Sequence, residues 1–252
     1  MTKLVTLITG ASAGLGVEFA RQYAAKGHEL VLVARRRDRL DALAAELGKA
    51  RVVAMDLSEP HAASRLLADI ASAGEQVGTL VNNAGFGLVG AFDALDSARQ
   101  RQMVDLNCGL LAELAHGVIP GMKRLGHGGI LNVASVASFQ PGPGMATYFA
   151  TKAFVLSLSE ALHEEYRKTG IHVSALCPGP TATEFGDVAG FGGNSAVDVV
   201  KMTAEQVVAA GIKGLEANKA VVVPGVANKI SANSSRFLTR KAVRKVVGII
   251  KK

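Results

Sequence analysis

The sequence has no tryptophan and few aromatic residues, which account for 5% of its 252 positions. Charged residues are also sparse, at 19%, while hydrophobic residues make up 49%. The large hydrophobic share excludes a disordered tail or a fibre and indicates a globular protein with a sizeable core. The scarcity of aromatics, together with abundant glycine and alanine, favours close backbone packing in a parallel sheet over an aromatic-rich β-sandwich.

Only two cysteines occur, Cys108 and Cys177, and they lie far apart in the chain. Their spacing matches no metal-binding or redox motif, so we expect ordinary thiols and no metal site. The apolar run at residues 3–9 is too short for a secretory signal. No apolar stretch reaches the length of about 18 residues that a membrane-spanning helix needs. We therefore expect a cytoplasmic protein.

Acidic residues are outnumbered, since 28 lysines and arginines face 21 aspartates and glutamates, for a net charge of +7. The excess gathers at residues 35–39 and in the tail at 228–252. Interleaved aromatics and nucleic-acid-binding modules are missing from both regions, so we expect no nucleic-acid partner. Two interpretations of the tail stay open: a solvated terminal helix, or a basic amphipathic helix in weak peripheral contact with an anionic membrane.

Short apolar runs alternate with longer segments of helical periodicity. Strands joined by helices pair in parallel through right-handed crossovers, and strands covered on both faces are continuously apolar. The pattern predicts a doubly wound α/β fold, with residues 1–252 as a single domain. The expected strands are residues 4–9, 29–34, 51–56, 79–83, 130–135, 172–177 and 220–224, and the expected helices are 15–26, 39–47, 62–72, 101–124, 148–169, 204–217 and a terminal helix or frayed tail at 242–252.

A glycine-rich turn links the first expected strand to the first expected helix. Glycine tolerates a positive φ in a tight turn and lets the backbone approach a pyrophosphate, and a last glycine lets the helix pack on the sheet. Free N–H groups at the start of the helix then face the anion. We therefore predict a dinucleotide-binding turn made of Gly10, Ser12, Gly14, Leu15 and Gly16.

Three consecutive arginines, Arg35 to Arg37, follow the second expected strand. A carboxylate at this place would bind a ribose hydroxyl, whereas a guanidinium pairs with a 2′-phosphate. Three cations at a helix start oppose the helix dipole, which suggests an anionic partner. We therefore predict that Arg35 and Arg36 select NADP(H).

A tyrosine and a lysine stand four residues apart, at Tyr148 and Lys152, on one face of an expected helix. A nearby ammonium stabilises a phenolate, so we expect Lys152 to lower the pKa of Tyr148 and make it a general acid and base. Ser135 ends the fifth expected strand, where open α/β sheets place their ligands. Asn107 lies within a long expected helix, where an amide is mildly unfavourable and a buried polar role is credible.

In this order and spacing, the motifs resemble the short-chain dehydrogenase/reductase family along nearly the whole chain. The resemblance implies a seven-stranded Rossmann-like sheet and an NADP-dependent carbonyl or alcohol oxidoreductase, a homodimer or homotetramer. The matching residues are Thr9, Gly10, Gly14, Gly16, Asp56, Leu57, Asn82, Asn83, Ala84, Gly85, Asn107, Ser135, Tyr148, Lys152, Pro178, Gly179, Pro180, Thr181 and Thr183.

The resemblance also implies roles for these residues. Tyr148 would exchange the proton, Ser135 would steady the substrate oxygen, Lys152 would also hold the nicotinamide ribose, and Asn107 would anchor a relay water. The implied cofactor contacts are Asp56 and Leu57 at the adenine, Asn83, Ala84 and Gly85 at the ribose and pyrophosphate, and Pro178, Gly179, Thr181 and Thr183 towards the nicotinamide.

The substrate-binding side is mostly apolar in sequence. Residues 186–200 are rich in glycine and alanine and lack a period, which is typical of a lid. With Gln140 and Phe185 expected nearby, we predict a hydrophobic small-molecule substrate. Two other functions stay open on the same fold: a dinucleotide-binding regulator without turnover, and a neighbouring chemistry such as enoyl reduction.

Overall fold

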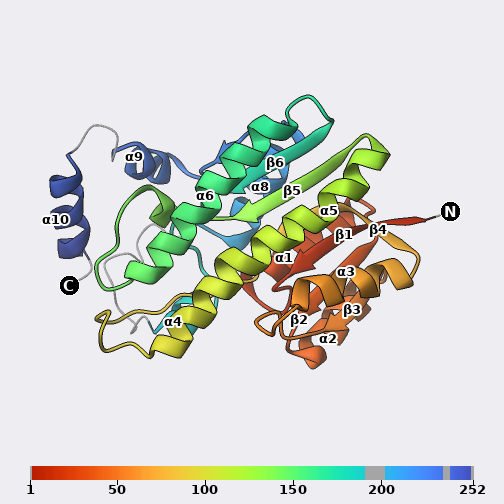
Figure 1. Cartoon of the computed structure of the whole chain (residues 1–252), viewed down its shortest axis with the longest axis horizontal. Coiled ribbons are helices and arrows are strands. Elements are labelled where there is room, and N and C mark those ends of the chain that lie inside the picture. Colours follow the sequence, from red (N-terminus) through yellow and green to blue (C-terminus); the bar gives the residue numbers. More distant parts are fainter. Residues whose placement is uncertain (1, 191–201, 235–238, 251–252) are drawn as a thin grey trace.

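The structure, a computed structural model, describes residues 2–190, 202–234 and 239–250. Part of the predicted lid and part of the predicted tail lie outside these ranges. One sheet of seven parallel strands forms the centre, in the order β3-β2-β1-β4-β5-β6-β7 (Figure 1). The strands are β1 (Lys3–Thr9), β2 (Leu30–Ala34), β3 (Ala50–Ala54), β4 (Glu75–Asn82), β5 (Gly128–Val133), β6 (Ile171–Leu176) and β7 (Val221–Val222). The predicted doubly wound α/β fold is confirmed.

Both faces of the sheet are buried. On β1, Leu7 packs into one core cluster and Ile8 into the other, and neither side chain is exposed to solvent. Successive side chains of a strand point to opposite faces, so burial on both sides explains the continuous apolar run of β1. One face is covered by α3 (Ala62–Ser72), α5 (Leu111–Leu125) and α6 (Ala146–Tyr166), and the other by α1 (Gly14–Ala25), α2 (Arg37–Leu47) and α8 (Ala204–Glu216).

The strand order reverses beside β1, which pairs with β2 on one side and with β4 on the other. In open parallel sheets such a switch point leaves a crevice at the carboxyl ends of the strands, where ligands bind. The glycine-rich turn after β1 and the residues after β4 and β5 all lie at this edge. The topology therefore places the predicted site residues at one end of the sheet.

The predicted helix at 101–124 is not continuous. The structure has α4 (Ser97–Val104), a π-helical turn (Asp105–Leu110) and α5 in succession. Asn107 lies in this turn and bonds to the chain outside the helix. A π-helical turn often marks a functional position, because its wider hydrogen-bond ring displaces local side chains and carbonyls.

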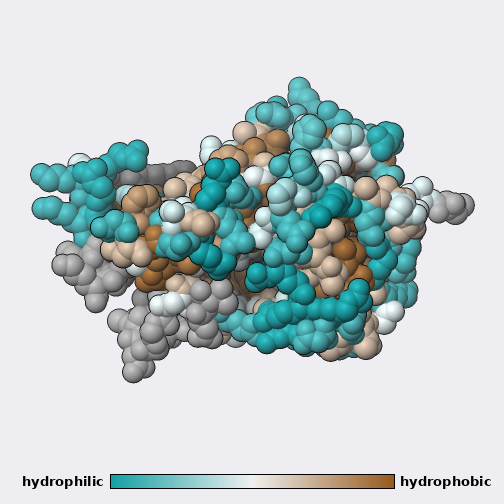
Figure 2. All heavy atoms as spheres, turned by 60° about the horizontal axis from the view of Figure 1, so that its bottom comes forward, coloured by the Kyte–Doolittle hydropathy of each residue, from teal (hydrophilic) through white to brown (hydrophobic). Residues whose placement is uncertain are grey.

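The described C-terminal part forms two helices, α9 (Val226–Ser234) and α10 (Arg240–Ile250), at the end of the molecule opposite the N-terminus (Figure 1). Val243 and Val247 of α10 are buried in the same cluster as Tyr148. In Figure 2 the outer surface of this end is hydrophilic, with hydrophobic side chains between it and the rest of the molecule. Among the described residues, no helix has the length and hydropathy required to cross a membrane.

Candidate active site

The glycine-rich turn is shaped for an anion at the start of α1. A Cβ on Gly16 would collide with the carbonyl of Gly10, and Gly14 adopts a φ of 53°. The N-cap residue is Ala13, which has no side chain that can bond to the first N–H groups of the helix. Those donors and the positive end of the helix dipole are therefore available to a phosphate.

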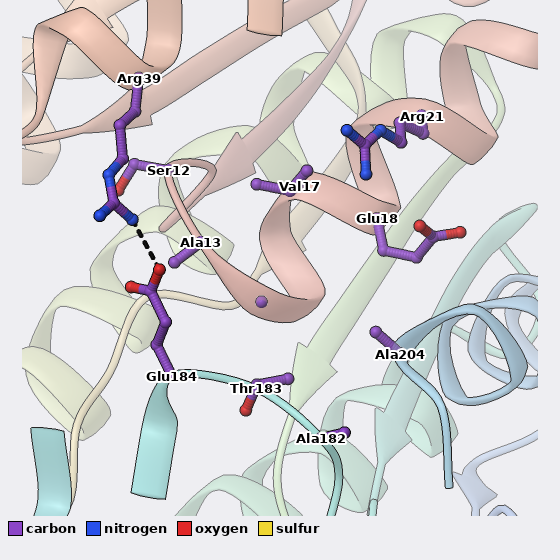
Figure 3. Close-up of a pocket in the computed structure, with 11 residues that line it drawn as sticks. Ser12, Ala13, Val17, Glu18, Arg21, Arg39, Ala182, Thr183, Glu184 and Ala204 are labelled. Atoms are coloured by element: carbon purple, nitrogen blue, oxygen red, sulfur yellow. Dashed lines mark hydrogen bonds and ion pairs between the residues drawn. The ribbon is translucent and has the colours of Figure 1, made fainter. Parts of the chain in front are cut away.

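An open pocket of about 400 Å³ adjoins this turn (Figure 3). It is lined by residues of the turn and of α1, by Arg39 of α2, by residues 182–184 and by Ala204 at the start of α8. Tyr148 is not among its lining residues. The pocket therefore belongs to the phosphate end of the crevice and not to the catalytic end.

The end of β4 is tied to the end of β1 by Thr9. Its hydroxyl accepts hydrogen bonds from the backbone N–H groups of Asn83 and Ala84, each at 3.0 Å. The amide of Asn83 in turn donates to the carbonyl oxygens of Thr9 and Gly10, at 2.9 and 3.2 Å. These bonds fix the glycine-rich turn against the residues after β4, so that both form one rigid floor.

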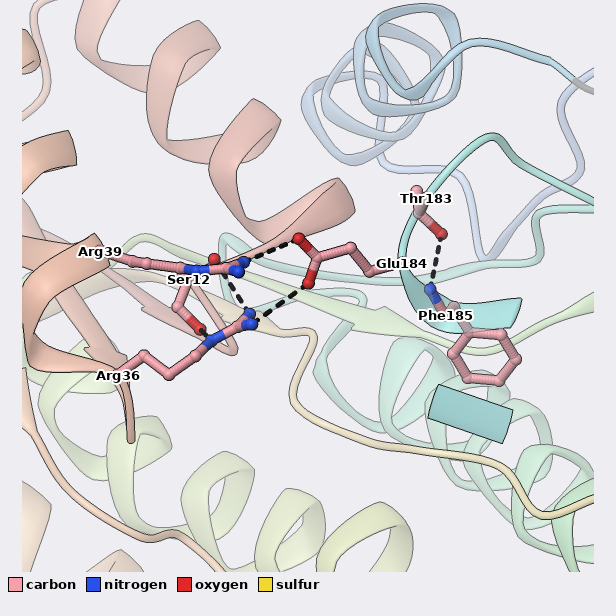
Figure 4. Close-up of polar contacts among 6 residues, drawn as sticks. All are labelled: Ser12, Arg36, Arg39, Thr183, Glu184 and Phe185. Atoms are coloured by element: carbon pink, nitrogen blue, oxygen red, sulfur yellow. Dashed lines mark hydrogen bonds and ion pairs between the residues drawn. The ribbon is translucent and has the colours of Figure 1, made fainter. Parts of the chain in front are cut away.

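Of the two predicted arginines, Arg36 has the closer contacts with this floor. It donates to the hydroxyl of Ser12 at 3.2 Å and to the Ser12 carbonyl at 3.1 Å. Arg35 is 70% exposed, and its guanidinium lies 4.0 Å from the carboxylate of Asp56. Sequence reasoning missed a third partner, Glu184, whose carboxylate accepts from Arg36 at 3.2 Å and from Arg39 at 2.7 Å (Figure 4).

The remaining predicted cofactor residues line the same edge of the sheet. Asp56 accepts hydrogen bonds from the backbone and hydroxyl of Ser58, and Leu57 is buried in the core. A Cβ on Gly85 would lie 2.7 Å from Oδ1 of Asn107, so the glycine allows the backbone and the Asn107 side chain to approach closely.

The residues after β6 contact other parts of the site. Pro178 accepts a bond from the N–H of Val136, Thr181 bridges to Met202, and Thr183 packs on Gly14. A Cβ on Gly179 would collide with Asn228, and Leu15 packs against the second core cluster.

Tyr148 lies near the start of α6 and is 8% exposed. Burial raises the pKa of its phenol to about 12, against the lowering effect of a hydrogen bond with Ser135. Ser135 follows β5, and its hydroxyl also accepts a bond from the N–H of Ala137 at 3.1 Å. The structure therefore brings the predicted serine and tyrosine together.

The sequence predicted that Lys152 lowers the pKa of Tyr148, but the position of Lys152 in the structure does not produce this effect. The Lys152 ammonium is buried, donates to the carbonyl oxygen of Val133 at 2.7 Å, and lies 5.8 Å from the centre of the Tyr148 ring. Burial lowers the pKa of Lys152 to about 8. The prediction that Lys152 depresses the pKa of Tyr148 is not met here, because desolvation of the phenol dominates.

Asn107 is 1% exposed, and both polar atoms of its amide form hydrogen bonds within the chain. Its oxygen accepts from the N–H of Phe86 at 3.1 Å, and its nitrogen donates to the Phe86 carbonyl at 2.9 Å and to the hydroxyl of Thr151 at 3.1 Å. The side chain thus joins the segment after β4 to α6, one turn from Tyr148. Neither Phe86 nor Thr151 could be recognised as a partner from sequence spacing.

An apolar cluster surrounds Tyr148. Phe185 of the short helix α7 (Phe185–Ala189) lies with its ring 5.4 Å from that of Tyr148. Where the sequence predicted the start of an irregular lid, α7 is helical, because Phe185 packs inward and Ala189 accepts a bond from Val89. Gln140, half-buried, directly follows the 3₁₀ turn Val136–Phe139. The cluster also contains Phe86, Met103, Ala137, Met145, Phe149, Val243 and Val247.

The family profile of the short chain dehydrogenases matches residues 4–193. The chain belongs to this family. Sulfoacetaldehyde reductase 2 of Chromohalobacter salexigens is 35% identical over 201 residues, which cover 78% of this chain and 80% of that protein. The NADP-dependent 3-hydroxy acid dehydrogenase YdfG of Escherichia coli is 34% identical over 189 residues, covering 73% of this chain and 76% of that protein.

Among solved structures, a short-chain dehydrogenase from Sphingobium yanoikuyae in complex with NADPH has a TM-score of 0.82 and 34% identity. The match covers 96% of this chain and 95% of that one. The short chain dehydrogenase described here is accordingly an NADP-dependent oxidoreductase. Its own residues suit this cofactor, since the turn before α1 leaves N–H donors open and Arg36 stands beside Ser12.

Proposed function

We propose that this short chain dehydrogenase reduces a carbonyl compound, or oxidises the matching secondary alcohol, with Tyr148 as general acid and base. The observation that carries the proposal is the grouping of the buried Tyr148 and Lys152 with the half-buried Ser135 at the carboxyl end of β5, beside the switch point of the sheet. Perturbed ionisable groups at such an edge are typical of a reaction centre.

The proton is handled by the chain's own residues. When bound, NADPH supplies the hydride that the carbonyl carbon takes up. The hydroxyl of Tyr148 donates its proton to the carbonyl oxygen, and Ser135 holds that oxygen by a hydrogen bond. With its pKa raised to about 12, the phenol is protonated at neutral pH and therefore carries the proton that the reduction uses. In the reverse direction the phenolate of Tyr148 must accept the proton of the alcohol, and the ammonium of Lys152, 5.8 Å from the centre of the ring, would stabilise that phenolate.

Asn107 acts in this proposal as a positioning residue. Its bonds to Phe86 and Thr151 hold the segment after β4 at a fixed distance from α6. The relay water implied by the family resemblance would be bound at Asn107, through its backbone carbonyl or the second lone pair of its amide oxygen. Lys152 is also proposed to hold the nicotinamide ribose.

The proposed cofactor contacts run from the turn before α1 to the segment after β6. Arg36 and Ser12 would bind the 2′-phosphate, and Arg35 would contribute from the solvent side. The other proposed contacts are Gly10, Gly14, Leu15, Gly16, Asp56, Leu57, Asn83, Ala84, Gly85, Pro178, Gly179, Thr181 and Thr183.

We further propose a hydrophobic substrate, bound against Phe185, Gln140 and the apolar cluster around Tyr148. Val243 and Val247 close this cluster from the C-terminal side. A second substrate class, small anionic aldehydes and oxo acids, is favoured by the names of the two relatives and by the exposed cations Arg240, Lys241, Arg244 and Lys245 on α10.

A substrate panel tests the function and separates the two classes. NADPH oxidation, with NADH in parallel, is followed with aliphatic and cyclic ketones, 3-oxoacyl thioesters, sulfoacetaldehyde and short 3-oxo acids. Preference for the ketones or thioesters supports the hydrophobic site, and preference for the short acids supports the anionic one. NADPH binding without turnover on any member favours the alternative proposal, a dinucleotide-binding regulator.

We propose that α10 covers the substrate site. Its valines Val243 and Val247 are already buried against the body of the protein, so they are unavailable to a lipid surface. Removal of residues 236–252 should then raise the KM for substrate and leave the Kd of NADPH unchanged. Pelleting with anionic vesicles tests the other interpretation, peripheral membrane contact, which gains support if only the full chain sediments.

We also propose that the chain assembles as a homodimer or homotetramer. Three large hydrophobic side chains are exposed along the helices of one face: Val104 on α4, Leu125 on α5 and Phe154 on α6. Exposed apolar groups that recur on one face are typical of interfaces between subunits.

A further inference from the structure

Glu184 belongs to a segment that is held at both ends. Thr183, before it, packs so closely on the glycine-rich turn that a Cβ on Gly14 would lie 3.1 Å from its Cβ. Phe185, after it, packs against the ring of Tyr148. Figure 4 shows the carboxylate of Glu184 directed towards the arginines while the ring of Phe185 points the other way. The carboxylate is therefore presented to the arginines by a fixed backbone.

The carboxylate bridges two guanidinium groups. Its two oxygens accept from Arg39 at 2.7 Å and from Arg36 at 3.2 Å. Arg39 and Arg36 both lower the pKa of Glu184, so that the group is ionised at neutral pH. A carboxylate held by two guanidinium groups uses the same donors that a phosphate monoester would use. Glu184 thus occupies an anion site formed by Arg36 and Arg39, which precede it in the sequence by 148 and 145 positions.

We propose that Glu184 is an internal competitor of the cofactor's 2′-phosphate, which must displace it from Arg36 and Arg39 in order to bind. This inference rests on the proposed role of Arg36 as a 2′-phosphate ligand. If the carboxylate stayed, two like charges would share one pair of arginines; if it leaves, two ion pairs are broken. Either way Glu184 weakens the binding of nucleotides that carry a 2′-phosphate and leaves the binding of those without it unchanged.

The competition is intramolecular, so it acts at a high effective concentration and at every cofactor level. All three side chains are about half exposed, at 40%, 45% and 47% for Arg36, Arg39 and Glu184, so screening keeps the effect moderate. Substitution Glu184→Gln keeps the shape of the side chain and removes its charge. The variant is expected to bind a 2′-phosphorylated nucleotide about three- to tenfold more tightly than wild type.

Calorimetry with adenosine 2′,5′-bisphosphate and adenosine 5′-phosphate tests this without any turnover. The two probes differ only in the 2′-phosphate. The matched control is Glu18→Gln, because Glu18 lines the same pocket but bonds to Gln22 and not to the arginines. Support requires that Glu184→Gln tighten the bisphosphate alone and that Glu18→Gln affect the two probes alike. Unchanged or weaker bisphosphate binding in Glu184→Gln overturns the proposal, and weaker binding would mean that Glu184 organises the arginines instead.

Arg36→Ala separates this inference from the role of Arg36 on which it rests. Weaker bisphosphate binding in Arg36→Ala, with no change in Glu184→Gln, supports Arg36 as a ligand of the 2′-phosphate and overturns only the proposed competition by Glu184. No loss in Arg36→Ala shows that the phosphate is held elsewhere. In that case tighter binding in Glu184→Gln would be long-range repulsion, and displacement would be ruled out.

Discussion

The ammonium of Lys152 donates a hydrogen bond to the backbone carbonyl of Val133 at 2.7 Å. Val133 ends β5, two residues before Ser135, while Lys152 comes from α6, one turn after Tyr148. The bond therefore holds the helix that carries the tyrosine against the strand end that carries the serine. The ammonium is buried in this position, and burial lowers its pKa to about 8.

The depressed pKa of Lys152 predicts how stability depends on pH. Its folded pKa is about 8 and its unfolded value is 10.5, so between these values the unfolded chain binds more protons. Stability attributable to this group therefore rises with pH in that window, by about 1 kcal/mol between about pH 8 and pH 9. Urea unfolding of wild type and Lys152→Met at both values measures the difference. Equal pH slopes in the two proteins would show that Lys152 is not buried as a charge.

Arg36 is expected to discriminate between the two nicotinamide cofactors more strongly than Arg35. Arg36 bonds to Ser12 in the phosphate-binding turn, whereas Arg35 is exposed. Arg36→Ala should weaken NADPH binding about tenfold with no effect on NADH, and Arg35→Ala should weaken it by about twofold or less. Fluorescence titration of both cofactors measures this. A larger loss in Arg35→Ala would reverse the assignment.

Gly16→Ala is expected to destabilise the fold although alanine is the better helix former. The new methyl group would collide with the carbonyl of Gly10, and the turn or α1 would have to shift. Overpacking of this kind costs about 1–3 kcal/mol, more than the gain of up to about 1 kcal/mol in helix propensity. The control is Gly109→Ala, where a methyl group meets no atom within 4 Å. Thermal unfolding should show a lower Tm for Gly16→Ala alone.

Phe154 is expected to take part in subunit assembly. It is a large hydrophobic side chain on α6 and is 44% exposed. A glutamate there would place a charge in an apolar contact, so Phe154→Glu should shift the mass measured by light scattering towards the monomer. Lys49→Glu changes an exposed charge outside this face and should leave the mass unchanged. An unaltered oligomer in Phe154→Glu would place the interface elsewhere.

Much of the fold could be predicted from local pattern. Alternating apolar runs and helical segments gave the strands of the doubly wound sheet, because burial on both faces leaves a strong signal in segments such as residues 4–9. The π-helical turn at residues 105–110 could not be predicted in this way. It depends on bonds from Asn107 to Phe86 and Thr151, which lie 21 and 44 residues away.

Candidate site residues could be predicted where the local pattern requires one residue type at one position. Glycine-rich turns, Arg36, Ser135 and Tyr148 with Lys152 each have a local reason in the sequence. Glu184 has none, since it is one acidic residue whose meaning appears only when folding brings it to Arg36 and Arg39. The packing of Val243 and Val247 beside Tyr148 was equally hidden, although the terminal helix itself is confirmed.

The role of Tyr148 as proton donor is tested by the turnover of Tyr148→Phe, measured as NADPH oxidation with the best substrate of the panel and accompanied by an NADPH titration. The substitution removes only the hydroxyl of a buried ring. We expect the catalytic rate to fall by about 10²- to 10⁴-fold while the Kd of NADPH stays within about twofold of wild type. A variant that keeps turnover within a few-fold of wild type would contradict the role of Tyr148 as the proton donor.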